Sequence, residues 1–445
     1  MSEQESIFPP SLGEPGSEVV YYPSPLTQGL AAAAAAVPAA VKDEQISFTV
    51  SVPPASLPHI FAHRQWRAGM ILADLLASTS FSSPTGGGGF MGRLIRDKTV
   101  LELGCGTALP ALVAAHPQLG QAAFVLATDY NEDGLIVALK RNVARNADTT
   151  SRTTTTMTAA VAAGGAPSGT SLKAAGYTWG TSPDDIFDLI PRSVLTQRID
   201  AQKAPRSAAT ALAASRFDTI LLADTLWDLL SHSDLAKSLS QTLAQTAGAR
   251  VIVVAGLHTG RERLSEFVHK AARVGLCVCP LDDWDGSTTA SASSSSASAS
   301  SFSGSKSLWT ELELIREEEL EGKLARRSRD DVEAEAWTEH VLEFELAREE
   351  HEDDDDTTAA AAAAAADGND QQHGSRAQLA ADDDAAYPLR IESRGPRLTG
   401  RQRRFVSRES WRPEEAKERG GIKLRNRWMT VWTLRWETAS ALSLT

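Results

Sequence analysis

The chain has 445 residues, 23% of them charged, and a formal net charge of −13. This acidic balance argues against general nucleic-acid binding, because phosphate contacts need clustered Lys and Arg side chains. Its three cysteines, Cys105, Cys277 and Cys279, are too few for a disulfide framework, and the last two lack the spacing of a zinc site. We therefore expect a cytoplasmic or nuclear protein without a bound metal. No apolar run is long enough to span a membrane.

Segments of biased composition flank and interrupt the part of the chain that can build a core. Residues 1–44 carry Pro, Gly, Ser and an alanine tract, which predicts a disordered arm. Residues 287–421 combine serine-rich, acidic and polyalanine stretches, which predicts a low-complexity insertion with little core of its own. Residues 45–286 are predicted to form one α/β domain, to which residues 422–437 add the last strand.

Predicted strands and helices alternate from residue 46 onward. Strands are expected at 46–52, 99–103, 123–128, 217–222, 250–255, 276–280 and 427–437, where apolar and β-branched residues gather. Helices are expected at 59–77, 107–115, 133–147, 235–246 and 261–274, where apolar residues recur at near-helical spacing. Residues 151–171 are rich in Thr, Ala and Gly and predict a loop.

This alternation predicts βαβ units, and hence a doubly wound, mostly parallel sheet with helices on both faces. In such sheets, ligands bind outside the carboxyl ends of the strands, near the point where the strand order reverses. The residues that follow each predicted strand are therefore the candidates for a functional site.

The strongest local signal is the segment Val100–Thr107 (VLELGCGT), in which a buried strand ends in two glycines that precede a helix. Glycine permits a sharp turn and a close approach of the backbone to a ligand. A nicotinamide-dinucleotide site would carry a third glycine, where this chain has Leu109. The acidic Glu102, two residues before Gly104, suits a ligand that carries its own positive charge.

The second predicted strand ends in an acid, Asp129. In this topology an acid at that position accepts hydrogen bonds from ribose hydroxyls. Tyr130 is placed to stack on an adenine ring. We expect Asn142 and Asn146, in the following helix, to be surface residues, and we expect the same of His232 in a later helix.

Three further segments narrow the family. They are Trp66–Gly69 (WRAG), Tyr177–Gly180 (YTWG) and Leu222–Trp227 (LADTLW). Together with the glycine turn, they resemble methyltransferase family 16, which includes lysine methyltransferases and fungal proteins described as nicotinamide N-methyltransferase-like or as elongation-factor methyltransferases. The resemblance covers residues 46–286 and 423–437.

The resemblance implies a class I methyltransferase fold with a seven-stranded sheet and S-adenosylmethionine as cofactor. It implies a cofactor pocket built from Trp66, Gly104, Cys105, Gly106, Asp129, Trp179 and Ala223. Glu102 and Tyr130, argued above from their positions, complete the expected cofactor-binding set. Trp179 is expected at the adenine edge, and Cys105 is expected to contribute its backbone rather than its thiol.

Two residues are candidates for catalysis. Asp224 is expected to orient an amine or to receive its proton through water, and Trp227 to offer an aromatic face to the ammonium. We expect a monomer that methylates lysine or an N-terminal amine of a protein, such as a basic translation factor. The residues after Asp224 (TLWDLLSH) depart from the elongation-factor branch, so two alternatives stay open: a nicotinamide-like small-molecule acceptor, and a non-catalytic module that keeps the cofactor fold.

Overall fold

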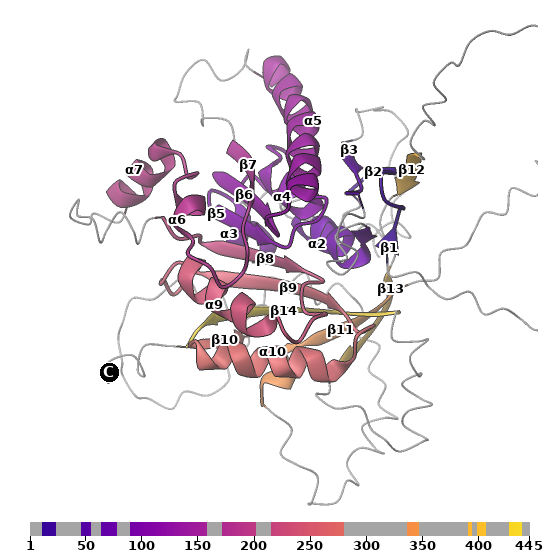
Figure 1. Ribbon diagram of the computed structural model, residues 1–445, viewed down its shortest axis with the longest axis vertical. Coiled ribbons are helices and arrows are strands. Elements are labelled where there is room, and N and C mark those ends of the chain that lie inside the picture. The colour runs from indigo at the N-terminus through magenta and orange to yellow at the C-terminus, as the bar shows by residue number, and fades with distance from the viewer. Residues whose placement is uncertain are drawn as a thin grey trace, which may run out of the picture.

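A nine-stranded mixed sheet lies at the centre of the protein (Figure 1). The computed structural model describes residues 11–23, 46–54, 64–77, 90–157, 171–201, 215–279, 336–346, 390–393, 398–405 and 427–437. Within these ranges, no helix is both long enough and apolar enough to cross a membrane.

Five parallel strands form one half of the sheet, in the order β7-β6-β5-β8-β9. Their bounds are Thr99–Leu103 for β5, Phe124–Asp129 for β6, Ser171–Gly176 for β7, Thr219–Ala223 for β8 and Arg250–Gly256 for β9. Strands β5, β6 and β9 are buried along their whole length, as parallel strands with helices on both faces must be. The order runs outward from β5 in both directions, so the switch point lies between β5 and β8.

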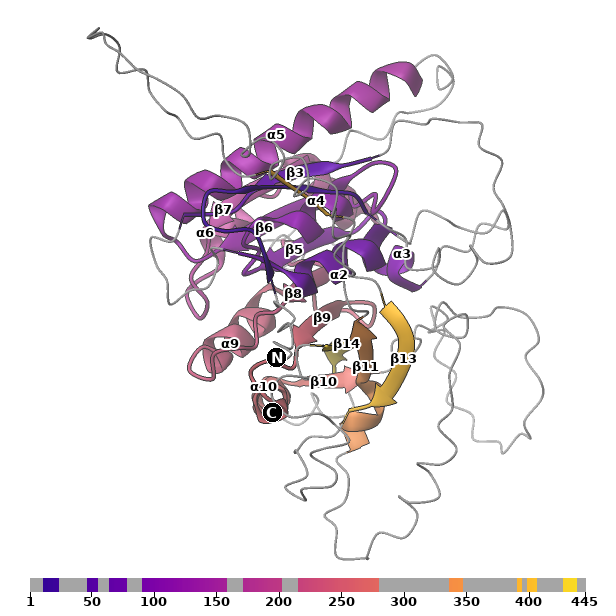
Figure 2. The same cartoon turned by 90° about the vertical axis from the view of Figure 1, so that its right-hand side faces the viewer.

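The other half of the sheet is antiparallel and begins with β14 (Trp428–Trp436), which pairs with β9. On its far edge, β14 pairs with β10 (Leu276–Cys279) along residues 433–436 and with β11 (Leu342–Leu346) along residues 428–431. The outermost strand there is β13 (Leu398–Arg404), at the end of the sheet opposite β7 (Figure 2). The predicted α/β fold with a mostly parallel central sheet is confirmed. Six of the seven predicted strands lie in this sheet, as β5, β6, β8, β9, β10 and β14, and β7, β11 and β13 complete the nine. The strand predicted at 46–52 belongs to a separate sheet.

Two layers of helices cover the sheet. Helices α2 (Arg67–Ala77), α4 (Leu109–Ala115) and α5 (Asp133–Met157) pack on one face, and α9 (His232–Thr242) and α10 (Arg261–Arg273) on the other. Alternate residues of β9 serve the two faces: Ile252 packs with the first layer and Val253 with the second. The shorter elements are α3 (Phe90–Ile95), α6 (Asp184–Phe187), α7 (Arg192–Ala201) and the 3-10 helix η3 (Ala336–His340).

A second, three-stranded sheet lies against α5, in the order β12-β2-β3 (Figure 1). It joins β2 (Glu18–Tyr21), β3 (Phe48–Ser51) and β12 (Arg390–Ser393), and a two-residue strand β1 (Ser11–Leu12) pairs with β4 (Gln65–Trp66). The Tyr21 hydroxyl is buried and bonds the Met70 carbonyl at 3.0 Å and the Asp74 carboxylate.

The structure differs from two of the predicted boundaries. Residues 11–21, assigned to a disordered arm, carry β1 and β2, because Val19, Val20 and Tyr21 bury their side chains in the core. The predicted insertion supplies β11 and β13 to the main sheet, and Glu343 of β11 forms a buried ion pair with Arg261 of α10.

Several element boundaries also differ. Helix α2 begins at Arg67, and residues 59–63 of the predicted helix lie outside the described residues. Helix α5 continues to Met157, into the predicted loop. Strand β7 was not predicted, because its sequence SLKAAG has little β-branched character; its pairing with β6 explains its conformation.

Candidate functional site

The glycine turn after β5 is held in left-handed backbone conformations. Gly104 and Gly106 have φ angles of 67° and 53°, and Ala108 has 66°. A Cβ added at Gly104 would lie 3.0 Å from Trp179 Cζ2 and 3.0 Å from Thr225 Cγ2. Gly104 is therefore required both by its backbone angle and by the side chains packed over it.

Asp129, at the end of β6, joins two of the strand ends. Its Oδ2 accepts a hydrogen bond from the Gly106 amide at 2.6 Å, and its Oδ1 accepts one from the Tyr130 amide at 2.7 Å. Burial raises the pKa of Asp129 from 3.8 to about 6, although both hydrogen bonds act to lower it. The predicted neighbourhood of Asp129 and the glycine turn is present. The Tyr130 residue is 46% exposed, so its ring is open to solvent.

Trp179 comes three residues after β7, which is separated from β5 by β6. Its indole packs over Gly104 of the glycine turn. The loop that carries it is tied to α9, because the Gly180 amide donates to Ser238 Oγ at 2.8 Å and the Tyr177 hydroxyl lies 3.2 Å from the same atom. The structure therefore brings together Gly104, Asp129 and Trp179, which come from the ends of three adjacent strands.

Glu102 has a different environment from the one predicted. Its carboxylate is buried beneath the turn and accepts a hydrogen bond from the Ala111 amide of α4 at 2.9 Å. Burial raises the pKa of Glu102 well above its usual range. The side chain fastens α4 to β5, so its predicted contact with the cofactor stays a prediction.

Cys105 also uses its polar groups within the turn. Its amide donates to the Thr128 carbonyl at 3.0 Å, and its carbonyl accepts from the Ala108 amide at 2.7 Å. Burial raises the pKa of the thiol well above its usual range. The backbone that we expected to meet the cofactor is therefore already hydrogen-bonded within the protein.

Asp224 lies immediately after Ala223, the half-buried last residue of β8, and has a φ of 57°, which is rare for a residue with a side chain. Its amide donates to the Val254 carbonyl at 2.8 Å, and its Oδ1 accepts from the Gly256 amide at 3.1 Å. The Asp224 side chain is thereby directed at the end of β9.

Trp227 lies three residues farther along the same loop and is half-buried. Its carbonyl accepts a hydrogen bond from Arg263 Nη1 of α10 at 2.9 Å. This bond fixes the loop, and the aromatic role of Trp227 stays a prediction.

Trp66 packs against His258, two residues beyond the end of β9, and its predicted contact with the cofactor stays a prediction. Its indole stacks on the imidazole of His258, with ring centroids 5.6 Å apart and planes inclined by 10°. His258 was not among the predicted residues, although it follows a strand end in the same way as Asp129 and Asp224.

The buried side-chain amides of Gln65 and Asn142 hold Thr107 of the glycine turn, and neither residue was predicted to do so. The Thr107 hydroxyl donates to Gln65 Oε1, and Asn142 Nδ2 donates to the Thr107 carbonyl at 3.3 Å. Asn142 additionally exchanges two hydrogen bonds with the Ser51 backbone of β3, at 2.8 and 2.9 Å.

The prediction that Asn142 and Asn146 are surface residues is wrong, because β3 covers that face of α5. The same prediction for His232 is also wrong. Its ring is buried against Phe267, and its Nε2 lies 3.1 Å from the Leu226 carbonyl.

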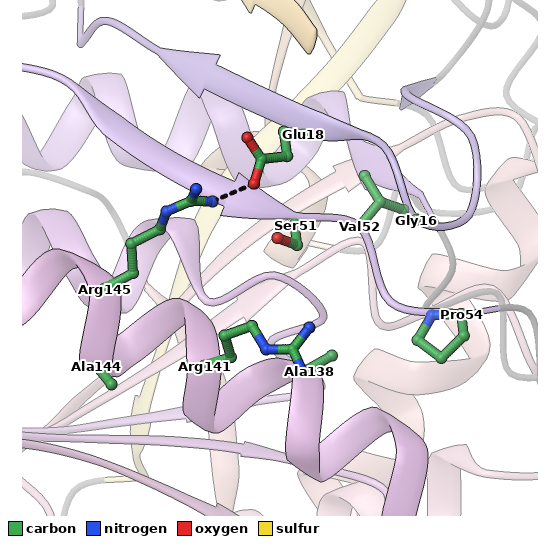
Figure 3. Close-up of a pocket in the computed structure, with 9 residues that line it drawn as sticks. All are labelled: Gly16, Glu18, Ser51, Val52, Pro54, Ala138, Arg141, Ala144 and Arg145. Atoms are coloured by element: carbon green, nitrogen blue, oxygen red, sulfur yellow. Dashed lines mark hydrogen bonds and ion pairs between the residues drawn. The ribbon is translucent and has the colours of Figure 1, made fainter. Parts of the chain in front are cut away.

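A cavity of about 730 Å³ lies between α5 and the β2–β3 ribbon, apart from the strand-end residues. Arg141 and Arg145 of α5 and Glu18 of β2 contribute its charged groups, and Arg145 pairs with Glu18 (Figure 3). Ser51 lines this cavity, and its backbone bonds the side chain of Asn142. The same Asn142 side chain bonds the Thr107 carbonyl, so it connects the cavity wall to the glycine turn.

Residues 59–161 match the model of methyltransferase family 16, whose description is lysine methyltransferase. The resemblance predicted from the glycine turn and the three accompanying motifs is thereby confirmed. The matched segment contains β4, the glycine turn and Asp129.

Curated relatives carry the description "protein N-terminal and lysine N-methyltransferase". The Schizosaccharomyces pombe protein is 26% identical over 194 residues, which are 44% of this chain and 55% of the relative. The Gibberella zeae protein is 29% identical over 182 residues, 41% of this chain and 52% of the relative. The chain thus spans about half the length of the curated relatives it matches.

Among solved structures, similarity is found to a putative methyltransferase complexed with SAH, with a TM-score of 0.26 and 11% identity over 51% of this chain and 44% of the other. A putative SAM-dependent methyltransferase from Streptococcus mutans gives a TM-score of 0.27 and 10% identity, with 52% of this chain and 46% of the other covered. Similarity at this level adds nothing to the fold seen in the sheet itself.

Proposed function

From the match of residues 59–161 to methyltransferase family 16, we propose that this protein transfers a methyl group from S-adenosylmethionine to an amine nitrogen of a protein, either a lysine side chain or an N-terminus. The observation that carries the proposal is the convergence of Gly104, Asp129 and Trp179 at the carboxyl ends of β5, β6 and β7. This edge of the sheet, next to the switch point, is where doubly wound folds bind ligands.

The residues present fit an adenosine-containing cofactor. Gly104 offers a backbone surface where a Cβ would collide with Trp179 and Thr225, and Asp129 offers a carboxylate for ribose hydroxyls. Trp179 offers an aromatic face for the adenine ring. The Thr225 hydroxyl is buried without a hydrogen-bond partner in the described structure, as expected of a group whose partner is a ligand.

The ends of β8 and β9 form the acceptor side of this site. When bound, the cofactor supplies an electrophilic methyl group on its sulfonium sulfur. The residues of the chain must bring the amine to that methyl group in line and keep water away. Asp224, which lies one strand from the glycine turn, attracts an ammonium ion, and Trp227 offers it an aromatic face.

The descriptions of the relatives support a protein as the acceptor. They name both N-terminal and lysine methylation, and both reactions act on a primary amine. The net charge of −13 supports a basic protein substrate, such as a translation factor, and we place the reaction in the cytoplasm with the protein acting as a monomer.

Incubation of the full chain with methyl-labelled S-adenosylmethionine and cell extract tests the proposal. The label should enter the protein fraction and not the small-molecule fraction. Entry into small molecules alone would support the nicotinamide-like acceptor instead. Cofactor binding without transfer to either fraction would identify a non-catalytic module.

A further inference from the structure

His258 occupies the acceptor side of the proposed site. Strand β9 ends at Gly256, and His258 follows two residues later, beside the end of β8 that carries Asp224. The side chain of His258 is 19% exposed, so part of the imidazole is open to solvent. Neither the sequence motifs nor the relatives' descriptions give this histidine a role.

The imidazole contacts Trp66 and Asp224 and lies close over Gly256. It stacks on Trp66 with planes inclined by only 10°. Its Nδ1 lies 4.0 Å from Asp224 Oδ1, which is an ion-pair distance rather than a hydrogen bond. A Cβ added at Gly256 would lie 2.6 Å from His258 Nδ1 and 3.5 Å from Asp224 Oδ1, so both side chains converge over a residue that must be small.

We propose that His258 accepts the proton that the acceptor amine must lose before it can be methylated, and that Asp224 stabilises the resulting imidazolium. This inference rests on the proposed function. A lysine ammonium, with a reference pKa of about 10.4, is neutral in roughly one molecule in 2,500 at pH 7. A base next to the acceptor therefore addresses the main chemical obstacle of the reaction.

The proton step balances without any further reactant. The ammonium N–H bond breaks, the proton bonds to an imidazole nitrogen, and the freed electron pair remains on the amine nitrogen for attack on the methyl carbon. His258 becomes a cation next to Asp224, and it afterwards returns the proton to solvent. Because Nδ1 faces the Asp224 carboxylate, the proposal assigns the proton transfer to Nε2.

Among the described residues, two charged side chains lie on elements next to His258. Asp224, after β8, provides the carboxylate. Arg263 of α10 is engaged with carbonyl oxygens, since its Nε donates to Thr259 and its Nη1 to Trp227. Trp66 contributes an uncharged ring. A cation on the imidazole is therefore balanced chiefly by Asp224.

The pH dependence of methyl transfer distinguishes this role from simple packing. In the wild type, the rate of label transfer into the main protein acceptor should rise less steeply with pH than in a variant without the base, because the imidazole takes the proton from the amine. The H258N variant should lose about 100-fold or more near neutral pH. Its residual rate should keep rising about tenfold per pH unit towards the pKa of the free amine.

The H269N variant is the matched control, since His269 is an exposed histidine of α10 outside the site. It should keep the wild-type rate and profile. A profile for H258N that runs parallel to the wild-type profile would overturn the inference, while wild-type transfer itself would leave the proposed function intact. Absence of transfer by the wild type would instead refute the proposed function.

A second readout does not depend on turnover. Comparison of histidine ring NMR spectra of the wild type and H258N assigns the His258 signal, and W66F should displace that signal by removing the stacked indole. Addition of n-butylamine to the full chain loaded with S-adenosylhomocysteine should shift the His258 signal saturably and leave the His269 signal in place. A His258 signal that does not respond to the amine would place the ring away from the acceptor and overturn the inference.

Discussion

The Asp129 carboxylate accepts a 2.6 Å hydrogen bond from the Gly106 amide, and this bond joins the loops that follow β5 and β6. The bond fixes the carboxylate at the edge of the glycine turn before any ligand arrives. Asp129 is also buried, which raises its pKa to about 6. The Asp129 carboxylate is thus well positioned for a ligand, but its burial in the charged form destabilises the free protein, as is common for functional acids.

Replacement of Asp129 by Asn should weaken cofactor binding. An amide oxygen can still accept the Gly106 hydrogen bond, but a hydrogen bond to a charged group contributes about 1.5–3 kcal/mol, so affinity should fall about 10- to 100-fold. Calorimetric titration with S-adenosylhomocysteine measures the change. Asp133→Asn, an exposed acid in the first turn of α5, is the control and should bind as the wild type does. Equal affinities for D129N and the wild type would remove Asp129 from the cofactor site.

The stability of the free protein should depend on pH through the same carboxyl group. The Asp129 pKa is 3.8 in the reference state and about 6 when folded, so the folded state binds the proton more tightly. The free energy of unfolding should therefore fall as pH rises from about 4 to 6, by up to about 3 kcal/mol from this group. In D129N this component should vanish, so the gain in melting temperature over the wild type should be larger at pH 7 than at pH 4. A difference that does not change with pH would contradict the assignment.

Gly104→Ala should abolish cofactor binding while costing only moderate stability. The new Cβ would meet Trp179 and Thr225 at 3.0 Å, on a backbone with φ of 67°. Gly16→Ala is the matched control, since Gly16 has φ of 84° but no heavy atom within 4 Å of a Cβ. Both variants should lose about 1–2 kcal/mol to backbone strain, and only G104A should lose the cofactor. Retained binding in G104A would show that the ligand does not use this turn.

Asn142→Ala should weaken both the fold and the cofactor site, because Asn142 bonds the Thr107 carbonyl as well as β3. Asn146→Ala removes a similar pair of bonds to the Thr49 backbone without touching Thr107. Each variant should cost about 1–3 kcal/mol for every buried group left without a partner. The melting temperatures of the two variants should be similar. The affinity for S-adenosylhomocysteine should be lower in N142A than in N146A. Similar affinities would show that Thr107 is held well enough by Gln65 alone.

The sequence was sufficient to predict strands β5, β6, β8 and β9 of the site, but not β7, which precedes Trp179. Val100–Thr107 and Asp129 were placed correctly because a buried parallel strand is an uninterrupted apolar run, and the residue after it lies at the ligand-binding edge. The same rule applied to β9 would have found His258, two residues beyond the strand end.

Other features could not be found in this way because they depend on tertiary pairing. Strand β11 lies within a charged segment, and its buried Glu343 pairs with Arg261 of α10. The burial of Asn142 depends on β3, which lies more than 90 residues away in the chain. Local periodicity carries no signal for such contacts.

The central claim, that the protein methylates a protein amine, is tested most directly by mass spectrometry of the labelled acceptor from cell extract. The account predicts methyl groups on a lysine Nζ or on an N-terminal nitrogen, dependent on the wild-type chain and absent with G104A. Methyl groups on carboxyl, thiol or arginine nitrogen atoms, or on small molecules alone, would contradict it.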